Sequence, residues 1–415
     1  MPIAASGTLS LNGTTATRSL GLEIGTADET TVSLNDPFLR TLAGVASGQI
    51  SFSSFYGKTY TEVSGGLWTW GDGLYGQLGD NTRTNRSSPV QTVSGGTNWR
   101  YLPDGQGRYL ASSIKSDGTL WVWGYNVFGS IGDNTRTNRS SPVQTVSGGT
   151  NWRESAGGYI SFAATKTDGT LWNWGGGDTG NLGTNNITSR SSPVQTVAGG
   201  TNWRSRITRG GTFWSGGIKT DNTLWCWGRL VGDNTRTNRS SPVQTIAGGT
   251  NWRQASGFMY NDGCVATKTD GTLWGWMDDD RVFGAQYSSP IQVFGGGTNW
   301  KQAYGGLYAA YGIKTDGTLW RIGNDNVGTA SSSPTQVVSG QRNWYNFSGQ
   351  YYGIHTVYTN GTLWGYAPTG STFSPNGSLG DNGYGGVYSL VQTVAGGTGW
   401  KKVSAGDRHV VAIKS

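Results

Sequence analysis

The sequence predicts an all-β protein in which seven similar units close into a β-propeller behind a short segment of different composition. Three observations lead to this prediction. One tryptophan-containing phrase occurs seven times, a second such phrase alternates with it, and the two ends of the array carry complementary parts of one unit. In a repeat protein the number of modules, rather than the chain length, decides the architecture.

The first phrase reads DGTLWVWG at residues 117–124 and recurs with small changes in every unit. Its first tryptophan stands at Trp68, Trp121, Trp172, Trp225, Trp274, Trp320 and Trp364. A period of about 50 residues is typical of propeller blades and long for the turns of a solenoid.

The second phrase, GGTNW or a close variant, lies between successive copies of the first. It ends at Trp99, Trp152, Trp203, Trp252, Trp300, Trp344 and Trp400. Seven copies of each phrase indicate that one module is repeated seven times.

Each unit divides into four strand-like pieces. If a unit begins at Pro142, its strands are PVQTV (142–146), NWRESAG (151–157), YISFAATK (159–166) and TLWNWG (170–175). Four antiparallel strands make one propeller blade. The Asp-Gly pair before the last strand favours a type I′ hairpin turn, which needs a positive φ at both central residues.

Alternation assigns the two faces of the tryptophan strand. In TLWVWG, Leu120 and Val122 point to one face, and Trp121 and Trp123 point to the other. Neighbouring blades cover both faces, so we expect the repeated indoles to pack between blades rather than to stack on a sugar.

The two ends of the array predict how the ring closes. The chain ends with HVVAIKS (409–415), whereas the first unit starts directly with GGLWTWG (65–71) and lacks the strand that precedes this phrase elsewhere. We expect the last strand to pair with the first strand of the array. One blade would then combine both ends and leave no open edge between blades.

Several of these motifs resemble the RCC1 repeat, especially its bacterial and viral variants. They are VSAGDRHVVAIKS (403–415), the DGTLW-x-WG phrase and GLYGQLGD (73–80), and the resemblance covers residues 62–415. It implies a seven-bladed RCC1-like β-propeller. Propellers of this type serve as nucleotide-exchange factors, chromatin readers and binding scaffolds, so the fold alone does not decide the function. The GQLG motif is missing near residues 280 and 325, where we expect a less regular half-ring.

Residues 1–61 do not carry the repeat and are predicted to form a separate, small β-rich segment. They contain two related phrases, SGTLSLNG (6–13) and GQISFSSFYGK (48–58). The second is similar to the N-terminal attachment segments of tail-fibre and other virion proteins of tailed bacteriophages. The resemblance implies that residues 1–61 bind other virion proteins; the alternative is a generic capping segment.

Charge and composition narrow the classes of function. The net charge is +7 without a run of five like charges, which favours a solvated surface over a nucleic-acid-binding face. Two cysteines without a CxxC motif do not make a disulfide framework. Because metal, phosphate-binding and nucleophile-elbow motifs are also missing, we expect no enzyme, no metal and no cofactor. The sequence shows neither a long apolar stretch nor a signal peptide, so we expect no membrane insertion.

Variation between units predicts where binding occurs. Residues 80–100 and 133–153 are identical, whereas the stretch after each NW phrase differs in every unit. Aromatic residues in these variable stretches suit a contact surface. The candidate ligand-binding residues are Tyr109, Tyr159, Phe213, Trp214, Phe258, Tyr260, Tyr304, Tyr308, Tyr351 and Tyr352. The alternative is that these aromatics line the central channel and pack there.

The repeated GDNTRTNRSSP loop is a second candidate for a contact surface. It places arginines at equivalent positions of three units: Arg83, Arg86, Arg136, Arg139, Arg236 and Arg239. These arginines suit an anionic glycan or a neighbouring virion subunit. The alternative is a solvated turn in which Asn and Asp side chains cap the backbone.

Together these patterns favour a non-enzymatic bacteriophage virion protein, a tail fibre or receptor-binding protein made in the host cytoplasm. The propeller would bind a host-surface glycan or outer-membrane component through multivalent weak contacts, and a homo-oligomer is compatible with this role. Two alternatives stay open. One is a purely structural decoration or tail-spacer protein, and the other is an intracellular protein-interaction scaffold of the RCC1-like class.

Overall fold

The chain divides into two compact units, Met1–Val63 and Ser64–Ser415. The computed structural model describes only residues of the second unit. The described residues are 64–207, 213–258, 262–293, 295, 297–307, 309–323, 331–337, 344–349, 353–358, 360–367, 377–383 and 387–415. The predicted attachment segment, residues 1–61, lies outside them.

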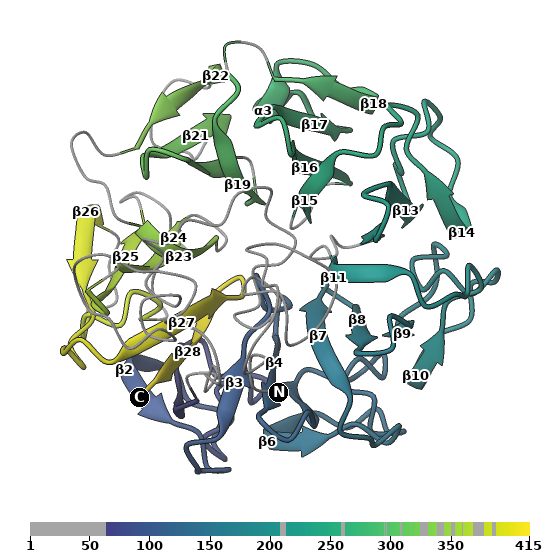
Figure 1. The fold of residues 1–415 in the computed structure, drawn as a ribbon. Coiled ribbons are helices and arrows are strands. Elements are labelled where there is room, and N and C mark those ends of the chain that lie inside the picture. The colour runs from purple at the N-terminus through teal and green to yellow at the C-terminus, as the bar shows by residue number, and fades with distance from the viewer. Residues whose placement is uncertain are drawn as a thin grey trace, which may run out of the picture. The chain divides into compact units, whose positions relative to one another are not determined.

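The second unit consists of seven four-stranded antiparallel sheets arranged as blades around a ring, which confirms the predicted all-β, seven-bladed propeller (Figure 1). Blade 1 combines β27, β28, β1 and β2, and blades 2 to 7 follow in chain order from β3–β6 to β23–β26. The innermost strands are β27 (Trp400–Ala405), β3 (Trp99–Tyr101), β7 (Trp152–Gly157), β11 (Trp203–Ile207), β15 (Trp252–Gly257), β19 (Trp300–Gly305) and β23 (Trp344–Gly349).

The remaining strands follow outward in each blade. Second strands are β28 (His409–Lys414), β4 (Leu110–Lys115), β8 (Ser161–Lys166), β12 (Trp214–Lys219), β16 (Gly263–Lys268), β20 (Ala309–Lys314) and β24 (Ile354–Tyr358). Third strands are β1 (Gly66–Gly71), β5 (Leu120–Gly124), β9 (Leu171–Gly175), β13 (Leu224–Gly228), β17 (Leu273–Met277), β21 (Leu319–Gly323) and β25 (Leu363–Ala367). Outermost strands are β2 (Arg86–Gln91), β6 (Arg139–Gln144), β10 (Arg190–Gln195), β14 (Arg239–Gln244), β18 (Tyr287–Gln292), β22 (Ser331–Gln336) and β26 (Val387–Gln392). Blade 5 also carries the short helix α3 (Asp280–Phe283).

Strand β28 closes the ring by pairing with β1 over the full length of both strands. Leu67 lies opposite Ile413, and both side chains are fully buried. The predicted closure by the two ends of the array is therefore confirmed. Because the sheet of blade 1 runs continuously from β2 through β1 and β28 to β27, the two ends of the array are joined within one blade.

The predicted starting point of a unit was wrong by one strand. The PVQ strand of β6 pairs with β5, where Val143 lies opposite Val122, so it ends blade 2 instead of opening blade 3. A cyclic repeat has no unique first strand in its sequence. Hydrogen bonding between strands decides where one sheet ends and the next begins.

The Asp-Gly turns also differ from the predicted type I′ geometry. At the turn of blade 2 only Gly118 has a positive φ (79°), and its N–H donates to the carbonyl of Lys115 (2.9 Å). Asp117 Oδ1 accepts hydrogen bonds from the backbone N–H (2.9 Å) and the hydroxyl (2.6 Å) of Thr119. The Thr119 hydroxyl in turn accepts from Trp121 Nε1 (2.9 Å). The Asp, Gly, Thr and Trp of the DGTLW phrase therefore all take part in the bonds of the turn, the leucine is fully buried, and the aspartate caps the turn with a negative φ of its own.

The antiparallel order gives the propeller two different ends. The turn end carries the hairpins between second and third strands and the connections from one blade to the next. The loop end carries the connections between first and second strands and between third and fourth strands. All variable stretches that follow an NW phrase join a first to a second strand, so the described parts of these connections lie at the loop end.

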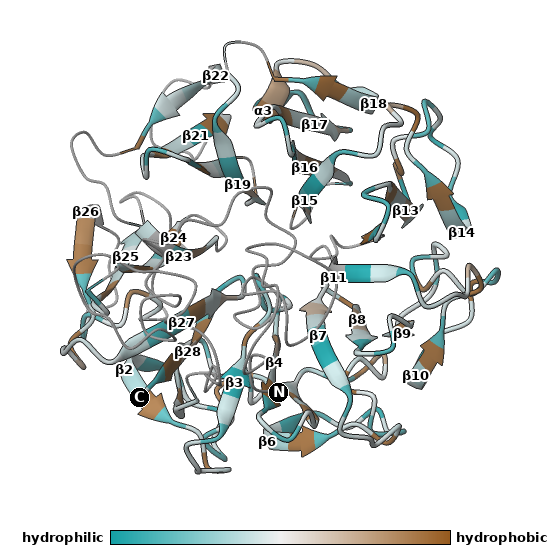
Figure 2. Cartoon of the chain, in the orientation of Figure 1, coloured by the Kyte–Doolittle hydropathy of each residue, from teal (hydrophilic) through white to brown (hydrophobic). Residues whose placement is uncertain are grey.

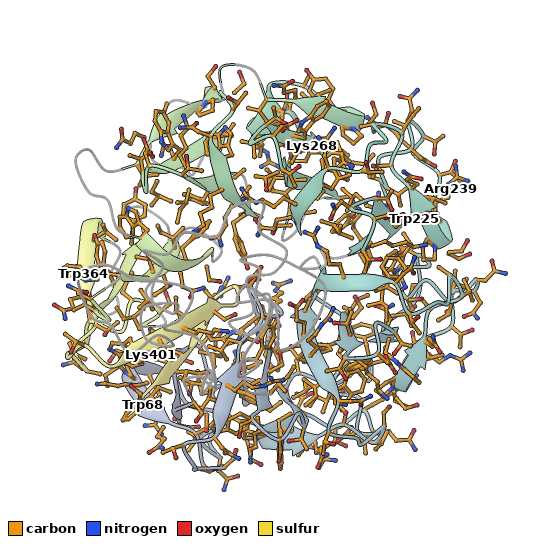
Figure 3. All side chains as sticks on the ribbon, in the orientation of Figure 1. Trp68, Trp225, Arg239, Lys268, Trp364 and Lys401 are labelled. Carbon is orange, nitrogen blue, oxygen red and sulfur yellow. The ribbon has the colours of Figure 1, made fainter. Side chains whose placement is uncertain are left out.

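The turn end is built from a repeated stack of two indoles and one ammonium group. In blade 2, Lys115 Nζ lies 4.8 Å from the ring of Trp99 and 4.2 Å from the ring of Trp121. The same arrangement recurs in blades 1, 3, 4, 5 and 6. In blade 7, Tyr358 takes the place of the lysine and stacks on Trp344. Figure 3 labels three of the outer tryptophans of these stacks, each in a different blade: Trp68, Trp225 and Trp364.

The second tryptophan of the phrase binds five of the blades to the preceding one. Trp123 Nε1 in blade 2 donates to the carbonyl of Gln77 in the GQLG loop of blade 1 (2.9 Å). Equivalent bonds enter blades 3, 4, 5 and 1. In blades 6 and 7 this tryptophan is replaced by Ile322 and Tyr366, and the preceding blades 5 and 6 have no sequence similar to GxLG. Blade 4 carries the variant RLVG (229–232), and its Leu230 carbonyl still accepts from Trp276 Nε1 (2.9 Å). A tryptophan at this position is therefore found in the five blades whose preceding blade carries GxLG or a variant of it.

Candidate ligand-binding site

The structure separates the ten predicted site residues into three groups. Trp214, Phe258 and Tyr304 are at most 2% exposed and belong to the hydrophobic core. For these three the packing alternative applies, because a fully enclosed side chain offers no surface to a ligand. Tyr109, Tyr159 and Phe213 are partly exposed at the loop end. The remaining four lie outside the described residues: Tyr260, Tyr308, Tyr351 and Tyr352.

The loop end of blades 1 to 3 carries a cluster of aromatic side chains that we call the tyrosine patch. It consists of Tyr75, Tyr109, Tyr125, Phe128, Tyr159 and Arg108, and all six are partly exposed. The ring centroid of Tyr75 lies 4.7 Å from that of Tyr109 and 5.0 Å from that of Tyr125. The guanidinium of Arg108 lies 4.7 Å from the Tyr109 ring and 4.5 Å from the Tyr159 ring. Such spacings are those of interacting aromatic and cation–π pairs.

Three members of the patch escaped the sequence-based selection because they do not follow an NW phrase. Tyr75, Tyr125 and Phe128 lie between third and fourth strands, in the connections that lead into the GxLG motif. A comparison between the blades of this chain could have identified these three residues. The corresponding connection of blade 3 carries Gly176 and Thr179 where blade 2 has Tyr125 and Phe128.

The connection that carries Arg108 and Tyr109 is braced by several blades. It spans residues 102–109, and within it Gln106 N donates to the carbonyl of Ala405 in blade 1 (3.0 Å). The carbonyl of Asp104 accepts from a serine hydroxyl of β23 in blade 7 (2.8 Å), and Arg108 N donates to a glycine carbonyl of blade 3 (3.3 Å). A contact surface fixed in this way loses little conformational entropy on binding.

An ion pair and a partly buried tyrosine hydroxyl lie at the centre of the patch. Arg108 Nε lies 3.3 Å from Asp407 Oδ2, and the carboxylate is nearly buried. Burial raises the pKa of the Tyr109 hydroxyl above its ordinary value, while the Arg108 charge acts in the opposite direction. Tyr109 therefore stays protonated at neutral pH and can donate a hydrogen bond as well as accept one.

The arginine loops of blades 1 and 2 lie in the same connections as Tyr75 and Tyr125, and each loop is held by hydrogen bonds within itself. Asp80 Oδ1 accepts from the N–H of Thr82 (3.0 Å), and Arg86 donates to Asp80 Oδ2 (2.9 Å). The loop of blade 2 has the same bonds, and Figure 3 labels Arg239 of blade 4, which makes the equivalent ion pair at the outer edge of the ring. The capping interpretation therefore accounts for one arginine of each loop. The other, Arg83 in blade 1 and Arg136 in blade 2, is exposed at the loop tip.

A second group at the loop end involves Phe213 and lies between blades 4 and 5. Arg229 places its guanidinium 5.7 Å from the Phe213 ring and its Nε 3.1 Å from Asp262 Oδ2. Burial raises the pKa of Asp262 to about 6, although Arg229 acts in the opposite direction. Phe213 therefore has a packing role, because its ring contacts the guanidinium of Arg229.

The hydropathy of the innermost strands shows what surrounds the ring centre. Figure 2 shows hydrophilic stretches on β7, β11 and β15, where the residues that follow each NW tryptophan lie. Among the residues that the structure describes, no group of His, Cys, Asp and Glu side chains has the arrangement of a metal site. No helix in this part of the chain has both the length and the apolar character needed to cross a membrane.

Comparison with known sequences supports the repeat type. The family model described as the regulator of chromosome condensation (RCC1) repeat matches residues 64–100. The ultraviolet-B receptor UVR8 of Arabidopsis thaliana is 26% identical over 159 residues, which are 38% of this chain and 36% of the receptor. The human E3 ubiquitin-protein ligase HERC2 is 28% identical over 161 residues, which are 37% of this chain and 3% of the ligase. This chain thus matches about a third of the length of UVR8 and a small part of HERC2.

Comparison with solved structures supports the same fold. Human WBSCR16 superposes with a TM-score of 0.69 at 15% identity, covering 84% of this chain and 98% of that one. Prp20p of Saccharomyces cerevisiae also reaches a TM-score of 0.69, at 14% identity, with 85% and 92% covered. At such identities the likeness concerns the fold, which is that of RCC1-like propellers.

Proposed function

We propose that this RCC1-like propeller is a non-enzymatic binding module that recognises a partner through its loop end. The observation that carries this proposal is the contrast between a constant frame and variable connections. The DGTLW turns and Trp–Lys–Trp stacks recur from blade to blade, whereas each connection between first and second strands has its own sequence. Connections that vary on a rigid scaffold are where binding residues are usually found.

The likeness to known proteins favours a protein-interaction scaffold as the first form of this proposal. Prp20p is described by its binding to Gsp1p and histones, and yeast RCC1 (Prp20) has been crystallised bound to Kap60. The fold is therefore suited to holding other proteins. Which proteins this chain binds is not carried over from these relatives, because fold does not determine the ligand.

A narrower form places the module on a bacteriophage particle, and one observation favours it. The phrase GQISFSSFYGK (48–58) is similar to the attachment segments of phage tail proteins. In this form, residues 1–61 bind other virion proteins, and the propeller is displayed on the tail or particle surface to contact a host glycan or outer-membrane component. Several copies on one particle would raise the avidity without any new contact.

The binding proposal is tested by comparing variants of the two ends. The full chain, a loop-end variant (Tyr75→Ser with Tyr125→Ser) and a turn-end variant (Val93→Ser with Val146→Ser) are immobilised and exposed to an extract of the cells that express the gene. We expect a defined set of partners to be retained by the full chain and the turn-end variant and reduced at least about tenfold on the loop-end variant. Equal retention by all three would contradict recognition by the loop end.

The virion form has its own measurement. Mass spectrometry of purified particles should detect the chain, and a chain lacking residues 1–61 should be missing from the particles. If the shortened chain still assembles into particles, the anchoring role of this segment is wrong. If no particle contains the chain, the intracellular scaffold remains.

A further inference from the structure

We infer that the tyrosine patch binds an acidic segment of a partner protein and that apolar side chains of this segment pack against the patch. The inference rests on the proposed function and specifies which part of the loop end makes the contact and what kind of partner it fits. Four observations support it: a comparison between blades, the bracing of residues 102–109, two exposed aliphatic side chains and the distribution of charge.

The comparison between blades shows that the propeller frame does not require these aromatic residues. The connection of blade 3 performs the same structural task as that of blade 2, since Trp227 Nε1 donates to its Asn181 carbonyl (3.0 Å). It does so with Gly176 and Thr179 in place of Tyr125 and Phe128. Five aromatic rings gathered at the surface of blades 1 to 3 therefore need an explanation other than folding.

The composition of the patch is that of a protein contact centre. Tyrosine and arginine are the residue types that most often dominate the binding energy of protein interfaces. Because residues 102–109 are tied to blades 1, 3 and 7, Arg108 and Tyr109 are already held in place before a partner arrives. A contact of this kind gains affinity mainly because little has to be ordered on binding.

The aliphatic residues beside the rings favour a protein over a saccharide. Leu74 precedes Tyr75 and is 57% exposed, and Val127 precedes Phe128 and is 47% exposed. Pyranose rings stack on flat aromatic faces but gain little from branched aliphatic side chains. Apolar side chains of a peptide would cover both residues and remove their surface from water.

The charge around the patch favours an acidic partner. The arginine loops are bonded to the segments that carry the tyrosines, since Gly73 N donates to Asn85 Oδ1 (3.0 Å) in blade 1 and Asn126 N donates to Asn138 Oδ1 (2.8 Å) in blade 2. These bonds hold the exposed tips that carry Arg83 and Arg136 next to the patch. The aspartates of the same loops are already bound by Arg86 and Arg139, so Arg83 and Arg136 are the charges of these loops that are left for a partner. Carboxylates of a partner fit such guanidinium groups in bidentate geometry.

The test is a selection with the full chain from a library of random 12-residue peptides, followed by binding measurements on synthetic copies of the enriched sequences. We expect the enriched peptides to combine Asp or Glu with Leu, Phe or other apolar residues. Tyr109→Ser with Tyr125→Ser should weaken their binding at least about tenfold. Arg83→Gln with Arg136→Gln should weaken it less and reduce its dependence on salt. The matched controls are Thr179→Ser at the blade 3 counterpart and Val197→Ser at the turn end, and neither should change the affinity.

The outcomes separate the inference from the proposed function. The inference is overturned if the enriched peptides are basic or bind equally well to the tyrosine variants; in that case another surface binds and the module itself stands. It is also overturned if alginate, a polyuronate, binds in a patch-dependent manner while no peptide is enriched. If neither peptides nor alginate bind, the inference fails, whereas the proposed function is judged separately by the retention of partners from the cell extract. A loss of binding in the tyrosine variant could also come from misfolding. The arginine variant is not subject to this objection, because Arg83 and Arg136 are exposed and their substitution leaves the core unchanged.

Discussion

The two ends of the propeller differ in how far their sequences are constrained. At the turn end, each described hairpin repeats the same two bonds: a threonine hydroxyl donates to an aspartate or asparagine side chain, and a tryptophan Nε1 donates to that threonine. At the loop end, the connection of blade 2 spans residues 102–109, whereas the corresponding connection of blade 3 is only residues 158–160. The difference teaches that the turn end follows one pattern, whereas the loop end combines repeated third-to-fourth connections with first-to-second connections that vary in length and sequence.

The largest effect is expected from breaking the frame at the turn end. Trp152 is fully buried between Trp172 and Trp174, and its Nε1 donates to the carbonyl of Gly148 (2.9 Å). Trp152→Ala should lower the free energy of unfolding by about 3–5 kcal/mol because it leaves a cavity in the core between blades 2 and 3. Urea unfolding measures this loss. Trp152→Phe is the control and should cost less, since it keeps most of the apolar volume.

A second effect, about 3 kcal/mol, concerns the interior near the loop end and depends on pH. Burial lowers the pKa of His355 to about 4, against 6.5 in an unfolded chain. Between these values the unfolded chain binds a proton that the folded chain does not, so stability is fully present above pH 6.5 and is lost as the pH falls to 4.

The histidine contribution is measured as a difference between two proteins, because other groups titrate in the same range. Asp262, whose pKa is raised to about 6, acts in the opposite direction. Its folded form binds a proton more tightly than the unfolded chain, so its contribution to the stability of the protein increases as the pH falls. The unfolding free energy of the wild type and of His355→Gln should therefore be compared at pH 7 and pH 4.5. The variant should lose less stability on acidification; parallel pH curves would rule out the buried neutral histidine as the cause.

Two glycines at the turn end allow the cost of a steric clash to be measured apart from the cost of a left-handed backbone conformation. Gly118 has a φ of 79°, and a Cβ there would collide with the Thr150 carbonyl of the connection to the next blade. Gly95 has a φ of 52° but has open space around it. We expect Gly95→Ala to cost about 1–2 kcal/mol for the left-handed conformation alone. Gly118→Ala should cost about 1–3 kcal/mol more, because backbone must also move. If both variants lost the same unfolding free energy, the close contact between Gly118 and the Thr150 carbonyl would not constrain the residue at position 118.

The smallest effect on stability is expected at the loop end. Tyr125 is partly exposed and packs on Tyr75 and Phe128, and blade 3 has a glycine at this position. Tyr125→Ser should therefore lower the free energy of unfolding by only about 1 kcal/mol, the contribution of an aromatic contact. Thermal unfolding measures it. A loss comparable to that of Trp152→Ala would mean that the patch belongs to the core and would remove the contrast between the two ends.

The sequence by itself determined the number of blades and the way the ring closes. Both follow from counting: seven copies of each phrase, and a final HVVAIKS strand that supplies what the first unit lacks. The fastening of blades was also visible in part, because the two units that follow blades without any GxLG-like sequence have Ile322 and Tyr366 instead of tryptophan. These features can be predicted from the sequence because the same residue types recur at a regular spacing along the chain.

Only the tertiary structure decided which strands share a sheet and which aromatic residues reach the surface. The sequence placed Phe258 and Tyr109 in equivalent variable stretches, yet the first is buried and the second is partly exposed. The reason is that the burial of a connection depends on the blade beside it. Tyr75, Tyr109 and Tyr159 come from three blades and meet only when these blades are packed side by side.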